Sequence, residues 1–120
     1  MRVLFDKCTP GGIAQSLTGH MVTKAESVGM GTLVNGVLLQ AAEARGYEVL
    51  VTCDQRMQYQ QNLKNRKIAL VVINTNHWPV IRADLSKVAQ AVNTATRGSY
   101  QLVTYQKPPL RRRKFIPPSP

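Results

Sequence analysis

Short apolar runs recur along the chain and predict strands that are separated by polar or helical segments. Residues 2–5 and 49–52 are two such runs, and residues 68–73 form the longest, with no polar position. An unbroken apolar run is typical of a parallel strand that is covered on both faces, since an exposed face would alternate with polar residues. Residues 21–23 and 100–105 predict two further strands.

Residues 33–45 carry the strongest helical pattern, and Gly46 is a suitable residue to end that helix. Its expected inward face consists of the apolar positions at three- and four-residue spacing, namely Val34, Val37, Leu38, Ala41 and Ala42. A second helix is expected from a cap at Asp84 through Thr96, ended by Gly98. Its expected inward positions are Leu85, Val88, Ala89 and Val92.

The remaining segments are shorter. Short helices are expected at residues 13–17, 25–28 and 57–63, a basic loop at residues 64–67 and a polar loop at residues 74–79. Strands that alternate with helices at this spacing predict an α/β fold with a small doubly wound sheet.

The length of 120 residues suits one domain. Residues 1–106 form the expected folded domain. Residues 107–120 hold five of the seven prolines and a basic run of four residues, so we expect a Pro-rich basic tail that is disordered until it binds a partner.

The composition excludes some classes of protein and favours others. Hydrophobic residues make up 43% and charged residues 18%, which is typical of a soluble globular domain. No apolar run approaches the roughly 20 residues of a membrane span. The chain begins with a predicted strand in place of a signal peptide, so we expect a cytoplasmic protein without a membrane partner. The net charge of +10 favours an acidic partner, most often nucleic acid. The basic run contributes four of these charges, so about six remain for the rest of the chain.

Two aspartates follow the first and third predicted strands. Asp6 comes after Val3-Leu4-Phe5, and Asp54 comes two residues after the strand at residues 49–52. Carboxylates that meet at the carboxyl edge of a parallel sheet can hold Mg²⁺ or Mn²⁺, which activates water and stabilises charge on a phosphodiester. Alternatively, each aspartate caps the turn that follows it, and spacing alone does not choose between the two interpretations. Asn35 has the same two alternatives, a helix cap or an amide presented to the crevice.

Two further groups of residues carry polar chemistry. Cys8 and Cys53 follow the same two strands and can be spatial neighbours, although two free thiols are the commoner state in such a chain. The amides of Gln61 and Asn62, beside Lys64, form either a solvated helix face or a surface that bonds phosphates and bases. No glycine-rich phosphate loop, Ser-His-Asp arrangement or zinc-ligand spacing is present in the sequence.

Three segments together resemble the small PIN-like domain family, which is related to the VapC-type toxin ribonucleases. They are Val3-Leu4-Phe5-Asp6, Asn35-Gly36-Val37-Leu38-Leu39-Gln40-Ala41-Ala42-Glu43, and Leu50-Val51-Thr52-Cys53-Asp54 with Tyr59-Gln60-Gln61-Asn62-Leu63. The resemblance implies a PIN-like three-layer α/β/α fold with a mainly parallel sheet. It also implies an Mg²⁺- or Mn²⁺-dependent ribonuclease, the toxin of a toxin–antitoxin pair, with an antitoxin protein as partner. On this alignment Asp6 and Asp54 are catalytic, metal-binding acids, while Asn35 and Arg56 occupy positions where active members carry acids, and Glu26 is a candidate substitute.

Three functions follow as hypotheses. The first is a divergent metal-dependent ribonuclease acting through Asp6, Asp54 and Asn35. The second is a catalytically inactive PIN-like module that binds RNA or a protein, with RNA contacts at Arg56, Gln61, Asn62, Lys64 and Arg66. The third is a receiver-like phosphoacceptor domain, because Asp54, Met57, Thr75 and Lys107 resemble that family in their order. A homodimer is left open by the sequence.

Overall fold

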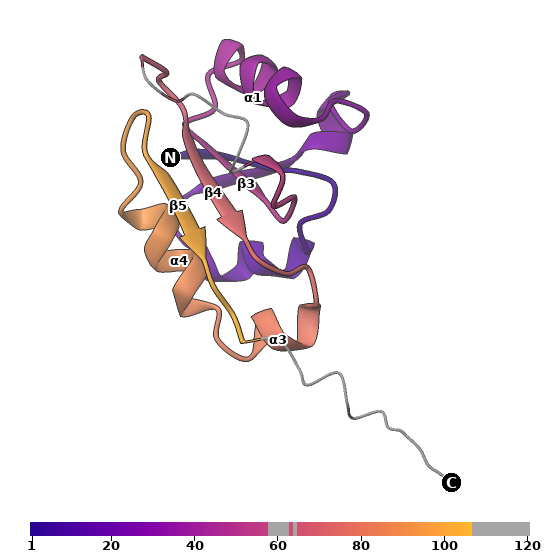
Figure 1. The fold of residues 1–120 in the computed structure, drawn as a ribbon, viewed down its shortest axis with the longest axis vertical. Helices are drawn as coiled ribbons and strands as arrows, with labels where there is room; N and C mark the ends of the chain where they lie inside the picture. The colour runs from indigo at the N-terminus through magenta and orange to yellow at the C-terminus, as the bar shows by residue number, and fades with distance from the viewer. Residues whose placement is uncertain (58–62, 64, 107–120) are drawn as a thin grey trace, which may run out of the picture.

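The computed structural model describes residues 1–57, 63 and 65–106 of the chain, and its centre is a five-stranded parallel sheet (Figure 1). The strand order is β2-β1-β3-β4-β5, and every neighbouring pair is parallel. The strands are β1 (Arg2–Phe5), β2 (Met21–Lys24), β3 (Val49–Thr52), β4 (Ala69–Ile73) and β5 (Tyr100–Val103). All five strands lie where the apolar pattern predicts them.

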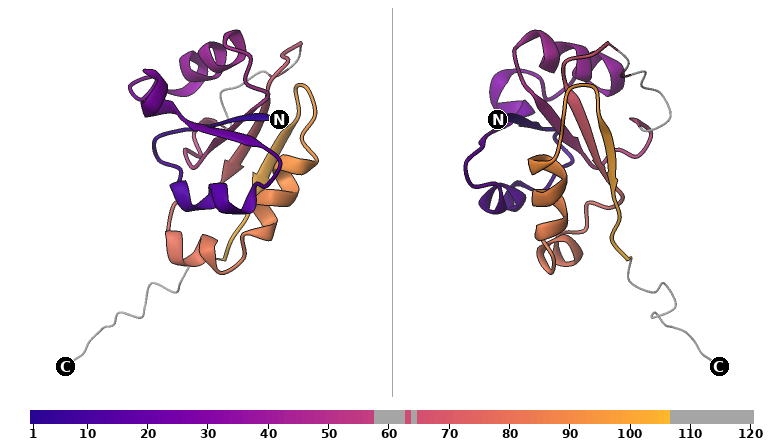
Figure 2. Two further views of the ribbon diagram at one scale, coloured as in Figure 1. Left: turned by 180° about the vertical axis from the view of Figure 1, so that it is seen from behind. Right: turned by 90° about the vertical axis from the view of Figure 1, so that its left-hand side faces the viewer.

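Both faces of the sheet are covered, because alternate residues of each central strand pack into two separate cores. In β4, Ala69, Val71 and Ile73 belong to one core, and Leu70 and Val72 belong to the other. The first core is closed by η1 (Gly11–Ser16), α3 (Trp78–Arg82) and α4 (Ser86–Asn93). The second is closed by η2 (Ala25–Val28) and α1 (Asn35–Ala44). Figure 2 shows α1 and α4 on opposite sides of the sheet. The fold is therefore a three-layer α/β/α arrangement, and the predicted fold class is confirmed.

The order of the strands creates one switch point in the sheet. From β1 the chain runs through η1 on one face to β2, then returns through η2 and α1 on the other face to β3. From the end of β1 the chain leads to β2 on one side, whereas from the end of β3 it leads to β4 on the other side. The two loops therefore leave a crevice between them, outside the carboxyl ends of β1 and β3. The expected carboxylates of Asp6 and Asp54 follow these two strands.

Helix α1 ends at Gly46 as predicted, with the glycine at a φ of 85°, but the predicted inward face is partly wrong. Its buried side chains are Leu38, Leu39 and Ala42, while Val34 is 45% and Val37 60% exposed. Val34 precedes the helix in an extended conformation, so it does not share the helical phase. The helix therefore turns a neighbouring stripe of its surface to the sheet.

The helix predicted from Asp84 to Thr96 is shorter in the structure, where α4 runs from Ser86 to Asn93, and a separate short helix begins at the end of the predicted polar loop at residues 74–79. Helix α3 begins at Trp78, where Pro79 is tolerated because the first turn has no internal donor to lose. Helix α4 begins at Ser86, with Leu85 as its N-cap residue and no capping side chain. Asp84 therefore does not cap it; its carboxylate accepts a bond from the Ser86 hydroxyl at 2.5 Å.

The short predicted helices at residues 13–17 and 25–28 appear as the 3-10 helices η1 and η2. The helix predicted at residues 57–63 and the basic tail lie outside the described residues, apart from Met57 and Leu63. Within the described ranges, no helix combines the length and apolar character that crossing a membrane requires.

Candidate functional site

The candidate site lies at the switch point, where β1 and β3 end side by side. These strands pair in register from Val3 opposite Val49 to Phe5 opposite Val51. The ladder continues one step further, because the Asp6 amide donates to the Val51 carbonyl at 3.0 Å. Asp6 thus lies beside the end of β3, and Asp54 follows two residues after that end.

Thr52 joins the two strand ends through its hydroxyl group. This side chain is fully buried, and its Oγ1 donates to Asp6 Oδ2 at 2.8 Å and accepts from the Asp54 amide at 3.0 Å. Sequence reasoning did not single out Thr52. Its signal was a lone hydroxyl at the end of an otherwise apolar strand, a position where a buried polar group needs partners.

Asp6 is almost fully buried, and both of its carboxylate oxygens accept hydrogen bonds. Oδ1 accepts from the Lys7 amide at 2.6 Å, and Oδ2 accepts from Thr52 and, at 3.6 Å, from the Cys8 thiol. A turn closed by the Thr9 amide on the Asp6 carbonyl, at 2.9 Å, folds Cys8 back toward β3. The carboxylate is therefore held in one orientation by donors from its own turn and from β3.

Asp54 forms a bidentate ion pair with Arg56. Arg56 Nε donates to Oδ1 at 2.9 Å and Nη2 to Oδ2 at 2.7 Å, and the Arg56 amide donates to Oδ1 at 3.0 Å. The Arg56 side chain is 70% exposed and that of Asp54 only 18%. The guanidinium hydrogen bonds hold the pKa of the Asp54 carboxyl below its usual range. Asp54 thus stabilises the turn that follows it, which was one of the two alternatives, while it also faces the crevice.

A cavity of about 310 Å³ lies between these groups. Its lining combines two carboxylates, two cationic side chains, two thiols and one apolar residue, namely Asp6, Asp54, Lys7, Arg56, Cys8, Cys53 and Val34. The cations suit an anion such as phosphate. The carboxylates suit a divalent cation only if Arg56 leaves Asp54, because Arg56 already engages both Asp54 oxygens.

The two cysteines are free thiols and neighbours in this cavity. The Cys53 amide donates to Cys8 Sγ at 3.4 Å, and Cys8 Sγ lies 3.6 Å from Thr52 Oγ1. The neighbouring Cys53 thiol is the main cause that lowers the pKa of Cys8 to about 7. The Cys8 side chain, together with burial, raises the pKa of Cys53 above its usual range. Cys8 is therefore the more reactive of the two at neutral pH.

Asn35 does not cap α1, since Val34 is the N-cap residue and no side chain caps the helix. It is the first residue of α1 and has a φ of 52°, in the left-handed region that asparagine tolerates better than most residues. Its Oδ1 is buried and accepts no hydrogen bond within the described part of the chain. Val34, the residue before it, lines the cavity. An orphaned buried oxygen in a strained residue marks a position where a further partner would fit.

Of the predicted RNA-binding residues, Arg56 alone belongs to this site among those that the structure describes. Arg66 precedes β4 and so lies at the opposite, amino end of the sheet, where it pairs with Glu43 at 2.7 Å. Gln61, Asn62 and Lys64 lie outside the described residues.

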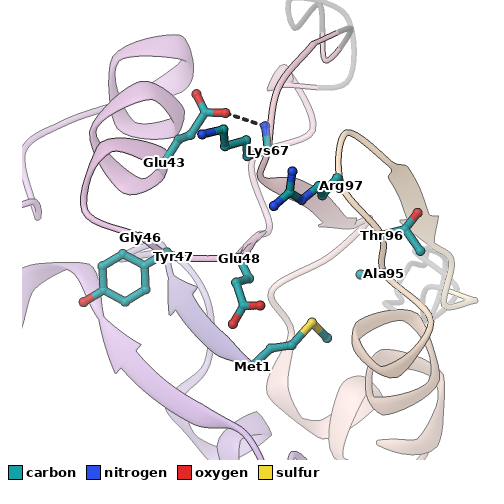
Figure 3. A pocket seen from close by; sticks show the side chains of 9 residues that line it. All are labelled: Met1, Glu43, Gly46, Tyr47, Glu48, Lys67, Ala95, Thr96 and Arg97. Atoms are coloured by element: carbon teal, nitrogen blue, oxygen red, sulfur yellow. Dashed lines mark hydrogen bonds between the residues drawn. The ribbon is translucent and has the colours of Figure 1, made fainter.

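A larger cavity of about 510 Å³ lies at that amino end (Figure 3). Glu43, Glu48, Lys67 and Arg97 bring charges of both signs to its lining. The Lys67 amide donates to Glu43 at 2.5 Å and, with a smaller effect of Arg66, holds the pKa of Glu43 below its usual range. Glu43 therefore already has its partners inside the chain.

The expected ligands Asp6, Asp54 and Asn35 suit Mg²⁺ or Mn²⁺ by donor type, since all three offer oxygen. Across residues 1–57, 63 and 65–106, no group of three or more His, Cys, Asp or Glu side chains is arranged to hold a metal ion. The strand order matches that of receiver domains, and Thr75 follows β4 at the same edge as Asp54. Met57 is fully buried, and Lys107 lies outside the described residues.

Comparison of the chain with protein-family models, curated proteins and solved structures gives no significant match in any of the three.

Proposed function

We propose that the protein is a PIN-like domain that binds RNA, with a backbone phosphate seated in the cavity at the β1–β3 switch point. The observation that carries this proposal is the orientation of Arg56. Its pairing with Asp54 uses Nε and Nη2, so the guanidinium is held at the cavity while Nη1 has no hydrogen-bond partner within the described residues. A guanidinium fixed in this way is well suited to a phosphate oxygen.

The charge around the cavity supports a polyanion as ligand. Asp54 is neutralised by Arg56, and the Asp6 carboxylate is buried and bonded on both oxygens. Lys7 lines the same cavity and its side chain is exposed. The four charged side chains of the lining sum to zero, but the two exposed ones, Lys7 and Arg56, are both cationic, and the whole chain has a net charge of +10.

Fluorescence anisotropy with a labelled single-stranded RNA tests this proposal. We expect Arg56→Ala to weaken binding about tenfold and to reduce the slope of log affinity against log salt by about 0.7, the value of one phosphate contact on a single strand. Arg97→Ala is the matched control, since it removes the same charge at the opposite end of the sheet. We expect chelators to leave the affinity unchanged. Equal losses for the two variants would refute a phosphate site at the switch point.

A second candidate, the Mg²⁺- or Mn²⁺-dependent ribonuclease, is supported by the orphaned Oδ1 of Asn35 and by Thr52, whose hydroxyl bonds to the Asp6 carboxylate and to the Asp54 amide. Asp6, Asp54 and Asn35 would hold the ion after Arg56 had moved away from Asp54. A bound ion would activate water and stabilise charge on the phosphodiester. In that role Thr52 would orient Asp6, and Arg56 would be free to contact the RNA.

RNA cleavage in Mn²⁺ buffer tests the second candidate. Cleavage by the wild type that is lost in Asp54→Ala, with RNA binding retained, would favour it. If the wild type and Asp54→Ala are equally inert across RNA substrates, the enzyme hypothesis fails. A toxin role with an acidic antitoxin depends on the ribonuclease activity. Removal of residues 108–120, followed by measurement of RNA affinity, shows whether the basic tail contributes to RNA binding.

A further inference from the structure

Cys8 and Cys53 are brought together by the same turn and strand that position Asp6. The turn after Asp6 directs Cys8 to the end of β3, where its Sγ lies 3.4 Å from the Cys53 amide nitrogen. Rotation about the Cα–Cβ bond of Cys53 changes the distance of its own sulfur from that nitrogen, and so from Cys8 Sγ. Both residues are half-buried and line a cavity of about 310 Å³, so a small reagent can reach them. Neither the RNA site nor the candidate metal site uses these thiols.

We infer that Cys8 and Cys53 form a redox-active dithiol, which closes reversibly to an intramolecular disulfide when it meets a low-molecular-weight disulfide such as glutathione disulfide. Both cysteines lie just beyond the ends of paired strands, and the 3.4 Å contact between Cys8 Sγ and the Cys53 amide nitrogen brings the two residues within reach of a disulfide bond. The inference does not depend on the proposed RNA function.

The reaction proceeds by two exchange steps. The Cys8 thiolate attacks one sulfur of glutathione disulfide, forms a mixed disulfide and releases one glutathione thiolate. The Cys53 thiolate then attacks the Cys8 sulfur, forms the Cys8–Cys53 bond and releases the second glutathione. The protein loses two electrons and two thiol protons, and the two glutathione molecules gain them.

Closure of this bond changes the surroundings of Asp6. The Cys8 thiol donates to Asp6 Oδ2 at 3.6 Å and lies 3.6 Å from Thr52 Oγ1, which donates to the same oxygen. Oxidation removes the Cys8 proton, so Asp6 Oδ2 keeps only the Thr52 donor. The redox state of the pair thereby alters the carboxylate at the switch point.

Equilibration of the full chain in glutathione buffers of increasing oxidised fraction, followed by alkylation and intact mass measurement, tests the inference. We expect the wild type to lose two hydrogen atoms, to resist alkylation at both cysteines and to form no disulfide-linked dimer. This form should exceed the glutathionyl adduct at least about tenfold, because the second thiol is held at a high effective concentration. Excess reduced glutathione should restore both thiols.

The variants Cys8→Ser and Cys53→Ser are matched controls that keep one thiol each. We expect both to stop at the glutathionyl adduct, with Cys8 modified faster than Cys53. A wild type that accumulates glutathionyl adducts or disulfide-linked dimers would overturn the inference. So would a wild type that stays reduced in buffers that modify the variants. The wild-type measurement decides the question even if a variant fails to fold.

Discussion

Replacement of Thr52 by valine removes the buried hydroxyl that joins the ends of β1 and β3 while it keeps the shape of the side chain. The Asp6 carboxylate then loses a 2.8 Å donor, and the Asp54 amide loses a 3.0 Å acceptor. A hydrogen bond to a charged group contributes about 1.5–3 kcal/mol, and one between neutral groups about 1 kcal/mol. The added methyl group recovers part of this, so we expect a loss of about 2–3 kcal/mol in the free energy of unfolding.

Thr52→Ser is the control for this substitution. It keeps the hydroxyl and loses one buried methyl group, which costs about 1 kcal/mol. Urea unfolding followed by the fluorescence of Trp78, the only tryptophan of the chain, measures both variants. With a slope of about 1–3 kcal/mol per molar urea, the midpoint of Thr52→Val should fall by roughly 1–2 M. If Thr52→Val is as stable as Thr52→Ser, the hydroxyl does not join the strands in the way described.

Four further predictions concern single groups. The alkylation rate of Cys8 should rise with pH around a midpoint near 7, because the thiolate is the reactive form, and Cys53→Ala should move this midpoint up toward 9. Glu43 has a lowered pKa, so its contribution to stability is complete above its ordinary value of about 4.5 and is lost as the pH falls through the folded value. In a plot of Tm against pH, Glu43→Gln should therefore fall less steeply at acid pH than the wild type, and an equally steep fall would contradict this. Burial raises the pKa of Tyr105 to about 12, so its phenol should titrate later than free tyrosine in ultraviolet absorbance, and the contribution to stability should fall as pH rises from about 10 to 12. Acetyl phosphate should leave the mass of the chain unchanged, because a guanidinium engages both oxygens of Asp54; a phosphoryl adduct would instead support a receiver function.

The positions of the strands could be predicted from the sequence because local patterns encode them. The apolar run at residues 68–73 predicts a strand buried on both faces, and β4 has its residues in both cores. The helices were predicted less well. Trp78 and Ile81 pack in the core and allow a helix in a segment with loop-like composition. The amino-acid composition of a segment reports only its local conformational preference, whereas this helix is stabilised by contacts with η1 and the sheet.

The candidate site, too, could be predicted from the sequence only in part. The sequence by itself determined that an aspartate follows each of two apolar strands and that a cysteine lies near each aspartate. Only the tertiary structure decided that these strands are neighbours, that Thr52 bonds to Asp6, and that Arg56 lies at the cavity while Arg66 lies at the far end of the sheet. The physical reason is that a strand is encoded by its own residues, whereas the contact between residues 6 and 52 depends on which strands pair across the whole sheet.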